Sequence, residues 1–335
     1  MLLLNGNEII EIFRGRERDI MNAVKAAYQT HAKGDSALPH SSFLRFPDKE
    51  RDRIIALPAY LGGGFRTAGI KWISSFPGNL EKDIERASAV LILNSLETGR
   101  PKAIMESSVV SSSRTAASAA IAADCLQGGQ PLSSVGLIGC GLINHETFRF
   151  LFASRPEIKN VFIYDVSAER AEQFLRKCQQ LSDKLNITIV ESPDALLRKA
   201  SVTAFATTAI KPHIFDISGC RSDSIILHTS LRDLSPEIIL SADNIADDID
   251  HICRAQTSVH LAEQQAGHRN FIRCTIGDIF NGDAQPRQSN KISIFSPFGL
   301  GILDLAVGDL ACKLAEEKNC GTVIQSFFPI PWTQR

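Results

Sequence analysis

A glycine-rich turn after a short apolar run decides the fold of this chain: Val135-Gly136-Leu137-Ile138-Gly139-Cys140-Gly141-Leu142-Ile143-Asn144. Residues 135–138 read as a buried strand, and a helix is predicted at residues 144–154. Gly139 permits a tight turn, and Gly141 lets backbone amides approach a pyrophosphate at the positive end of the helix dipole. Asn144 stands where the usual fingerprint has its third glycine. We therefore predict a dinucleotide site formed by Gly139, Cys140, Gly141, Leu142 and Ile143.

A second predicted strand, residues 160–164, is followed by an acid. Asp165 lies 24 residues beyond Gly141, close to the distance of about 20 at which a ribose-binding acid is found. A carboxylate there accepts hydrogen bonds from ribose hydroxyls and repels a 2′-phosphate, so the sequence predicts NAD rather than NADP. Two alternatives stay open. Asp165 caps the following helix, with Ser167 as a rival cap, and Arg170 either contacts a phosphate or is solvated.

Outward from this turn, predicted strands alternate with helices. A helix is expected at residues 168–181 and further strands at residues 187–190, 202–206, 224–227 and 244–246. This alternation is typical of a parallel sheet, whose ligands lie beyond the carboxyl ends of the strands. We therefore expect four residues that follow strands to flank the nicotinamide, with ordinary loop positions as the alternative: Thr207, Thr208, Ser230 and Leu231.

The flanking sequence has a different texture. Residues 2–4 are predicted to form a strand, and Asn7 to cap a helix running to Lys33. Residues 36–110 are rich in β-forming segments, and residues 112–126 form an alanine-rich predicted helix. Residues 127–134 contain Gly-Gly and Pro131 and are expected to form a domain junction. A helix at residues 299–317 and a strand at residues 321–328 complete the chain.

Composition excludes several classes of protein. The length of 335 residues suggests two domains, and the net charge of −1 gives no electrostatic reason to bind nucleic acid or an anionic membrane. The eight cysteines form no CxxC pair and no zinc-like spacing with histidine, which favours reduced thiols in a cytoplasmic protein without a metal. Four aspartates in residues 243–250 are expected to lie at a strand end and in a solvated loop.

Four basic residues in the first part of the chain are candidates for substrate binding. Lys71 lies within the apolar segment Ala68-Gly69-Ile70-Lys71-Trp72-Ile73, where burial requires a partner and suits a proton carrier. The alternative is an edge strand with Lys71 in water. Arg114 opens the alanine-rich helix, and its planar fork suits a carboxylate or a phosphate. Arg45 and Arg86 complete the set, and a surface ion pair with Glu85 or Glu81 is the alternative for Arg86.

At these residues the chain resembles the ornithine cyclodeaminase/mu-crystallin superfamily. Over nearly its whole length, and in the same order, it carries similar motifs: Ile70-Lys71-Trp72, Arg114-Thr115-Ala116-Ala117, the glycine turn, and Phe298-Gly299-Leu300-Gly301-Ile302-Leu303-Asp304-Leu305. The resemblance implies an α/β fold in which a Rossmann-type parallel-sheet domain is inserted into an α+β substrate-binding and dimerisation domain. The inserted NAD-binding domain is expected at residues 129–304, and the other domain at residues 1–128, completed by residues 305–335.

The resemblance also implies roles for single residues. Lys71, Arg114 and Arg45 are expected to contact a substrate carboxylate, and Asp304 to lie near the nicotinamide. Ser88 matches a family hydroxyl position close to the ligand. Lys71, Arg114 and Asp304 are thus the expected catalytic residues, and an amino-acid substrate and a homodimer are the expected partners.

Family members that are ornithine cyclodeaminases carry a glutamate where this chain has Ala56, and an aspartate that is missing or displaced in the segment 228–234. The segments 52–58, 69–73, 85–88 and 230–234 resemble instead N-(2-amino-2-carboxyethyl)-L-glutamate dehydrogenases, which supply 2,3-diaminopropionate for siderophores and peptide antibiotics. The resemblance therefore implies oxidation of a polyanionic glutamate conjugate, to which a basic pocket is complementary. Ornithine cyclodeamination, imine reduction or alanine oxidation, and a mu-crystallin-like binding protein are the alternatives.

Overall fold

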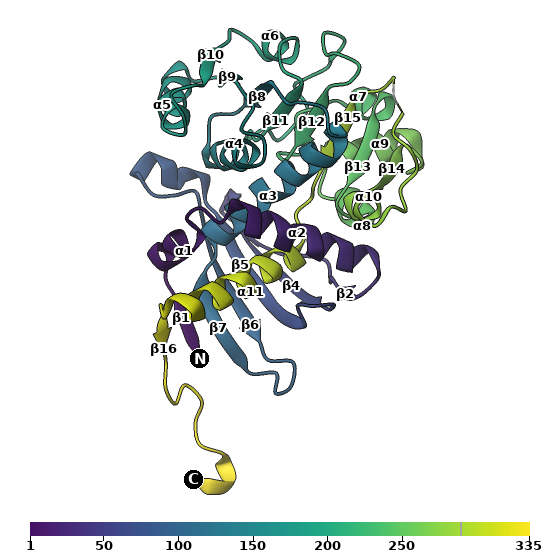
Figure 1. The fold of residues 1–335 in the computed structure, drawn as a ribbon. Coiled ribbons are helices and arrows are strands. Elements are labelled where there is room, and N and C mark those ends of the chain that lie inside the picture. Colours follow the sequence, from purple (N-terminus) through teal and green to yellow (C-terminus); the bar gives the residue numbers. More distant parts are fainter. Residues whose placement is uncertain (289) are drawn as a thin grey trace. The chain divides into compact units, whose positions relative to one another are not determined.

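Figure 1 shows the computed structural model of the chain, which describes residues 1–288 and 290–335. These residues form two compact units. The first unit comprises Met1–Arg16, Gly34–Ser111 and Leu300–Arg335, and the second comprises Glu17–Lys33 and Ser112–Gly299. The second unit is thus inserted in sequence into the first. Mixed α/β architecture with a Rossmann-type parallel sheet confirms the predicted fold class.

The first unit is built on one mixed sheet. Its described strands follow the order β16-β1-β7-β6-β5-β4-β2, and β3 pairs with β4. All neighbours are antiparallel except β1 and β7. The strands are β1 (Leu2–Leu4), β2 (Ser36–Ala37), β3 (Ser42–Phe46), β4 (Lys49–Leu61), β5 (Thr67–Ser75), β6 (Ala87–Asn94), β7 (Pro101–Glu106) and β16 (Thr322–Val323).

One face of this sheet is covered by helices. The helix α11 (Gly301–Lys318) packs against β4, β5 and β6, and also against α1 (Gly6–Phe13). Its small residues allow this close approach, because a Cβ at Gly308 would lie 2.3 Å from a methyl carbon of Leu91. The buried face of the sheet carries Leu61, Leu91, Leu93, Ala103 and Met105. Two short 3-10 helices complete the unit, η1 (Pro77–Lys82) and η2 (Trp332–Gln334).

The second unit contains a parallel sheet in the order β10-β9-β8-β11-β12-β15-β13-β14. The chain leaves β8 in one direction toward β9 and β10 and returns on its other side with β11. This reversal is the topological switch point at which such sheets bind ligands. The strands are β8 (Ser134–Ile138), β9 (Asn160–Tyr164), β10 (Asn186–Ile189), β11 (Val202–Phe205), β12 (Ile225–His228), β13 (Asp243–Ala246), β14 (Ile272–Thr275) and β15 (Ser293–Ser296).

Helices accompany these strands, and Figure 1 shows several of them beside the second sheet. The helix α3 (Ser108–Gln127) begins in the first unit and enters the second at Ser112. The others are α2 (Glu17–Ala32), α4 (Leu142–Ser154), α5 (Ala168–Gln179), α6 (Pro193–Leu197), α7 (Pro236–Ser241), α8 (Ile249–Ile252), α9 (Ser258–Ala266) and α10 (Ile276–Asn281). Among the described residues, no helix is long and apolar enough to cross a membrane.

The single helix expected up to Lys33 is wrong, because the chain forms α1 and α2 instead. Asn5, not Asn7, caps α1 in a capping box with Glu8. Gly15 adopts a φ of +71° between the two helices, a conformation that ends a helix. The break allows the two helices to pack in different units. The helix α1 packs on α11 in the first unit, and α2 packs on α10 and α4 in the second.

Other boundaries also differ from the expected ones. The helix after the glycine turn begins at Leu142 rather than Asn144, and the last strand covers only Thr322–Val323 of residues 321–328. Residues 17–33 and 112–128, expected in the first domain, belong to the second compact unit. A glycine explains part of this difference, because a Cβ at Gly277 of α10 would lie 2.7 Å from the carbonyl oxygen of Tyr28 in α2. The two helices therefore pack with backbones in close approach.

Candidate active site

Lys71 is buried and ion-paired at the centre of the first unit. It lies on β5, between β4 and β6, and only 1% of its surface is exposed. Its Nζ donates to Asp304 Oδ2 at 2.7 Å and to Ser111 Oγ at 3.1 Å. Asp304 is in the first turn of α11 and is itself fully buried. The edge-strand alternative for Lys71 is therefore wrong, and the predicted need for a partner is confirmed.

The strand register shows which basic residues share the face of Lys71. Side chains two and four positions apart on a strand point the same way, so Ser75 shares this face. Arg86 Nη1 donates to Ser75 Oγ at 2.8 Å. Arg45 pairs with Arg53, which pairs with Ser75, so the exposed Arg45 side chain lies in the same row. The structure thus places Arg45, Arg86 and Lys71 on one face of the sheet.

Ser88 and Ala56 lie on the opposite face. Ser88 pairs with Ser74, and the two hydroxyl oxygens are 2.8 Å apart. Ala56 pairs with Trp72, the neighbour of Lys71. Because neighbouring residues on a strand point to opposite faces, neither Ser88 nor Ala56 shares the face of Lys71. The structure does not bring the Ser88 hydroxyl together with the three basic side chains.

Arg114 lies on α3, three residues after Ser111, so the two residues occupy one side of the helix. Its guanidinium group lies against Gly299, where an added Cβ would be 2.8 Å from Arg114 Nη1. Gly299 has a φ of +92° and donates its amide to Asp247 at 2.7 Å. The backbone conformation therefore favours glycine at this position, and the absence of a side chain leaves room for the Arg114 guanidinium.

The sequence predicted a strand end and a solvated loop for the acidic residues 243–250. Asp243 does begin β13, but Asp243 and Asp247 are buried rather than solvated. Asp243 is buried and accepts from Arg273 Nε at 2.6 Å. Asp247 is also buried, and burial raises the pKa of its carboxyl against the lowering effect of the amides of Gly299 and Phe298. Asp250 is exposed and pairs with Arg269, as expected of a solvated loop, whereas Asp248 is partly buried and caps α8. Asp243 instead links β13 to β14 through Arg273. Asp247 holds the backbone amides of Phe298 and Gly299, just before Leu300.

The glycine turn follows β8 at the switch point of the second unit. Gly139 has a φ of +94°, and a Cβ there would lie 2.6 Å from the Ala206 carbonyl oxygen. Gly141 is the N-cap of α4 without a side-chain cap, and its Cβ position faces open space. Asn144, in place of a third glycine, is buried and donates to the carbonyls of Ile138 and Gly139. Uncapped helix amides beside an open glycine fit the pyrophosphate of a dinucleotide.

Asp165 holds this turn from the end of β9. Its Oδ2 accepts from the Cys140 amide at 2.8 Å and its Oδ1 from the Ser167 amide at 2.9 Å. Ser167, and not Asp165, caps α5. Arg170 Nε lies 3.5 Å from Asp165 Oδ1 and its side chain is largely exposed. Burial, followed by the charge of Asp165, raises the pKa of the Cys140 thiol to about 12, so this cysteine is not a nucleophile at neutral pH.

Replacing Asp165 with serine is expected to improve binding of NADPH relative to NADH by about tenfold, the equivalent of one charge-assisted hydrogen bond. The substitution removes the repulsion of a 2′-phosphate and leaves Arg170 to meet that group. Fluorescence titration with each reduced cofactor measures the change. The variant Asp165→Ser/Arg170→Ala is the control and should lose most of the gain. An unchanged ratio of affinities in Asp165→Ser contradicts the assigned position of the ribose.

The residues expected on the nicotinamide side follow β11 and β12. The Thr207 and Ser230 hydroxyls both donate to the carboxylate of Asp233. Leu231 has a φ of +69°, which is unusual for a residue with a side chain, and Thr208 is exposed. Sequence reasoning did not assign Asp233 any role. The only local signal is an acid five residues after a strand, and its partners lie on two segments of the chain.

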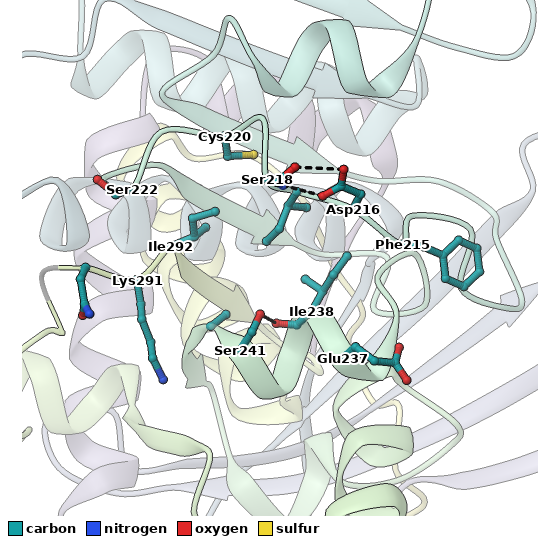
Figure 2. Close-up of a pocket in the computed structure, with 13 residues that line it drawn as sticks. Phe215, Asp216, Ser218, Cys220, Ser222, Glu237, Ile238, Ser241, Lys291 and Ile292 are labelled. Atoms are coloured by element: carbon teal, nitrogen blue, oxygen red, sulfur yellow. Dashed lines mark hydrogen bonds between the residues drawn. The ribbon is translucent and has the colours of Figure 1, made fainter.

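A cavity of about 470 Å³ lies elsewhere in the second unit (Figure 2). Its lining includes Phe215–Ser218, Cys220 and Ser222. It also includes Ala242 and Ile292, which directly precede β13 and β15. In a parallel sheet these positions mark the amino ends of the strands. The cavity therefore lies at the amino ends of the strands, whereas the glycine turn follows the carboxyl end of β8. It is not the predicted cofactor site.

Comparison with known proteins agrees with this arrangement. The model of the ornithine cyclodeaminase/mu-crystallin family matches residues 7–319. The N-((2S)-2-amino-2-carboxyethyl)-L-glutamate dehydrogenase of Staphylococcus aureus is 30% identical over 335 residues, which cover 98% of this chain and 99% of that protein.

Two solved structures have the same fold. An archaeal alanine dehydrogenase dimer with bound NAD is 29% identical, with a TM-score of 0.85 over 98% of this chain and 99% of that one. The Δ1-pyrroline-2-carboxylate reductase of Thermococcus litoralis, in complex with NADH and L-proline, has a TM-score of 0.89 at 22% identity, over 97% and 100% of the two chains. The chain belongs to the ornithine cyclodeaminase/mu-crystallin family, as its motifs predicted.

Proposed function

We propose that this protein is an NAD-dependent dehydrogenase that converts N-(2-amino-2-carboxyethyl)-L-glutamate to 2,3-diaminopropionate and 2-oxoglutarate. The observation that carries the proposal is the row of cationic side chains, Arg45 and Arg86, on the sheet face of the buried Lys71. The substrate has three carboxylates, so charge complementarity favours it over ornithine, which has one carboxylate and two ammonium groups. Similarity to the Staphylococcus aureus dehydrogenase over the whole chain supports the same conclusion.

In this proposal Arg45, Arg86 and Arg114 bind carboxylates, for which guanidinium groups have the matching planar geometry. Asp304 and Ser111 fix the ammonium of Lys71 in the sheet face, where it orients the substrate and the attacking water. Bound NAD supplies the acceptor for the hydride of the glutamate Cα. Water then adds to the resulting substrate imine, and cleavage of its C–N bond releases the two products.

The uncapped end of α4, Gly141 and Asp165 are the groups that would hold NAD. In this proposal the carboxylate of Asp165 binds the adenosine ribose. The nicotinamide half lies beside the residues that follow β11 and β12, namely Thr207, Thr208, Ser230 and Leu231. The archaeal alanine dehydrogenase, 29% identical, was solved with NAD, which supports this cofactor.

Absorbance of NADH at saturating NAD tests the function directly. We expect NADH to accumulate with N-(2-amino-2-carboxyethyl)-L-glutamate, together with an equal amount of 2-oxoglutarate, and not with ornithine or alanine. NADH formed only with alanine would make the protein an alanine dehydrogenase. Ammonia and proline from ornithine without net NADH would make it a cyclodeaminase, and either result overturns the proposal.

We further propose a cytoplasmic homodimer that pairs through the outer face of the first unit's sheet. By strand register this face carries four large apolar residues with 38–47% of their surface exposed, namely Leu3, Leu44, Trp72 and Val90. An apolar patch of this kind is typical of a protein interface, and the archaeal neighbour was solved as a dimer. Light scattering should give twice the mass of the chain, and a monomer across micromolar concentrations contradicts the proposal.

A further inference from the structure

Asp233 is a buried carboxylate on which two segments at the carboxyl edge of the second sheet converge. It follows β12 by five residues and has no exposed surface. Its Oδ1 accepts from the Thr207 hydroxyl and its Oδ2 from the Ser230 hydroxyl. Ring nitrogens also face it, with His213 Nε2 at 3.1 Å from Oδ1 and His228 Nε2 at 3.2 Å from Oδ2. One side chain thus connects the segment after β11 with the segment after β12.

The backbone strengthens this connection. The amides of His213 and Ile214 both donate to the Asp233 carbonyl oxygen at 2.9 Å, and the Ser235 amide donates to the Ile214 carbonyl at 3.0 Å. These bonds form a short parallel bridge between Ile214 and Leu234. The two segments are therefore held together at the carboxyl ends of β11 and β12. They lie beside the switch point, since β11 pairs directly with β8.

The charge of Asp233 sets the polarity of the hydroxyl groups. Burial alone would raise the pKa of its carboxyl, but the contact with His228 and the hydrogen bonds from Ser230 and Thr207 hold that pKa well below its usual range. An ionised carboxylate only accepts hydrogen bonds, so the hydroxyl protons of Thr207 and Ser230 must point toward it. The lone pairs of the two hydroxyl oxygens remain as acceptors. Thr207 Oγ1 already accepts from the Ala209 amide at 3.1 Å. Ser230 Oγ consequently presents an acceptor rather than a donor.

We infer that Asp233 is a positioning residue for the cofactor, which orients Ser230 Oγ as an acceptor for an N–H or O–H group of the nicotinamide half. This inference rests on the proposed use of NAD. Both the carboxamide NH2 and the ribose hydroxyls are donors of the required kind, and ligands of such sheets lie beyond the carboxyl ends of the strands. Asparagine at position 233 has nearly the same shape and keeps one acceptor oxygen. Because Thr207 already accepts from the Ala209 amide, we expect the asparagine NH2 on the Ser230 side, where it donates to that hydroxyl and reverses its polarity.

The test compares NADH affinity with thermal stability in the full chain, without any substrate. Asp233→Asn is expected to weaken NADH binding about tenfold, the loss of one hydrogen bond to a polar group together with an unfavourable donor–donor contact. The matched control is Asp243→Asn. Asp243 is buried in the same unit and accepts from Arg273 and Ser293. It lies at the amino end of β13, however, whereas Asp233 lies beyond the carboxyl end of β12. This control should lower the melting temperature and leave the NADH affinity within about twofold of wild type.

Ser230→Ala supplies an independent variant that removes one hydroxyl and keeps Asp233. We expect weaker NADH binding in Ser230→Ala, and little further loss when it is combined with Asp233→Asn, because both changes act on the same contact. Losses that add in full, or an Asp233→Asn protein that binds NADH like wild type, overturn the inference. Wild-type protein that does not bind NADH overturns the proposed cofactor itself, which separates the two failures.

Discussion

Replacing Lys71 with methionine is expected to lower kcat by a factor on the order of 10², the usual cost of misplaced reacting groups, because the ammonium that orients the substrate and the attacking water is lost. Methionine fills a similar volume without charge, so the sheet face keeps its shape. Asp304, however, is left as a buried carboxylate without the ammonium that lies 2.7 Å away. Breaking a buried ion pair in this way is expected to lower the free energy of unfolding by about 3–5 kcal/mol. Steady-state rates and chemical denaturation measure the two effects.

Stability and activity are separated by the variant Lys71→Met/Asp304→Asn. Both charges are then absent, and replacement of a whole buried pair is far less costly than loss of one partner. The double variant should therefore recover much of the stability lost in Lys71→Met and none of the turnover. If Lys71→Met at full saturation turns over like wild type, Lys71 is structural only and the assigned role is wrong.

Replacing Gly139 with alanine is expected to damage both the fold and cofactor binding. The residue has a φ of +94°, and its Cβ would lie 2.6 Å from the carbonyl oxygen of Ala206, a backbone atom that has little freedom to move. Strain of this kind costs about 1–3 kcal/mol. The turn must open to relieve it, which moves the Cys140 amide from Asp165 and displaces the end of α4. We expect NADH affinity to fall at least about tenfold, as one lost charge-assisted hydrogen bond would cause.

Gly141→Ala is the matched control within the same turn. Gly141 has a φ of −106°, which alanine adopts readily, and its Cβ would meet open space. The free energy of unfolding of Gly141→Ala should therefore stay within about 0.5 kcal/mol of wild type. The added methyl group, however, obstructs the approach of a pyrophosphate. Titration with NADH and thermal denaturation of both variants distinguish the two effects. Full NADH affinity in Gly141→Ala would show that the cofactor does not approach this turn.

Most of the second unit could be predicted from the sequence. The glycine turn, its strand and the later strands each leave a local pattern, because tight turns and buried strands restrict which residues fit. Asp165 was selected in the same way, by its spacing from Gly141; the structure shows that it holds the Cys140 amide, and its contact with the ribose stays a prediction. For the first unit, the apolar surroundings of Lys71 indicated that a buried cation would need a partner. Motif order along the chain was enough to indicate the family.

Contacts between distant segments were decided only by the tertiary structure. Lys71 and Asp304 are 233 positions apart, and no local pattern links them until α11 packs on β5. The same holds for Asp233, which meets Thr207 from 26 positions away. The face of Ser88 depends on strand register, where a shift of one residue turns a side chain to the other side of the sheet. Sequence by itself thus determined local backbone geometry and residue chemistry, whereas the partners of the charged groups depended on packing that brings remote segments together.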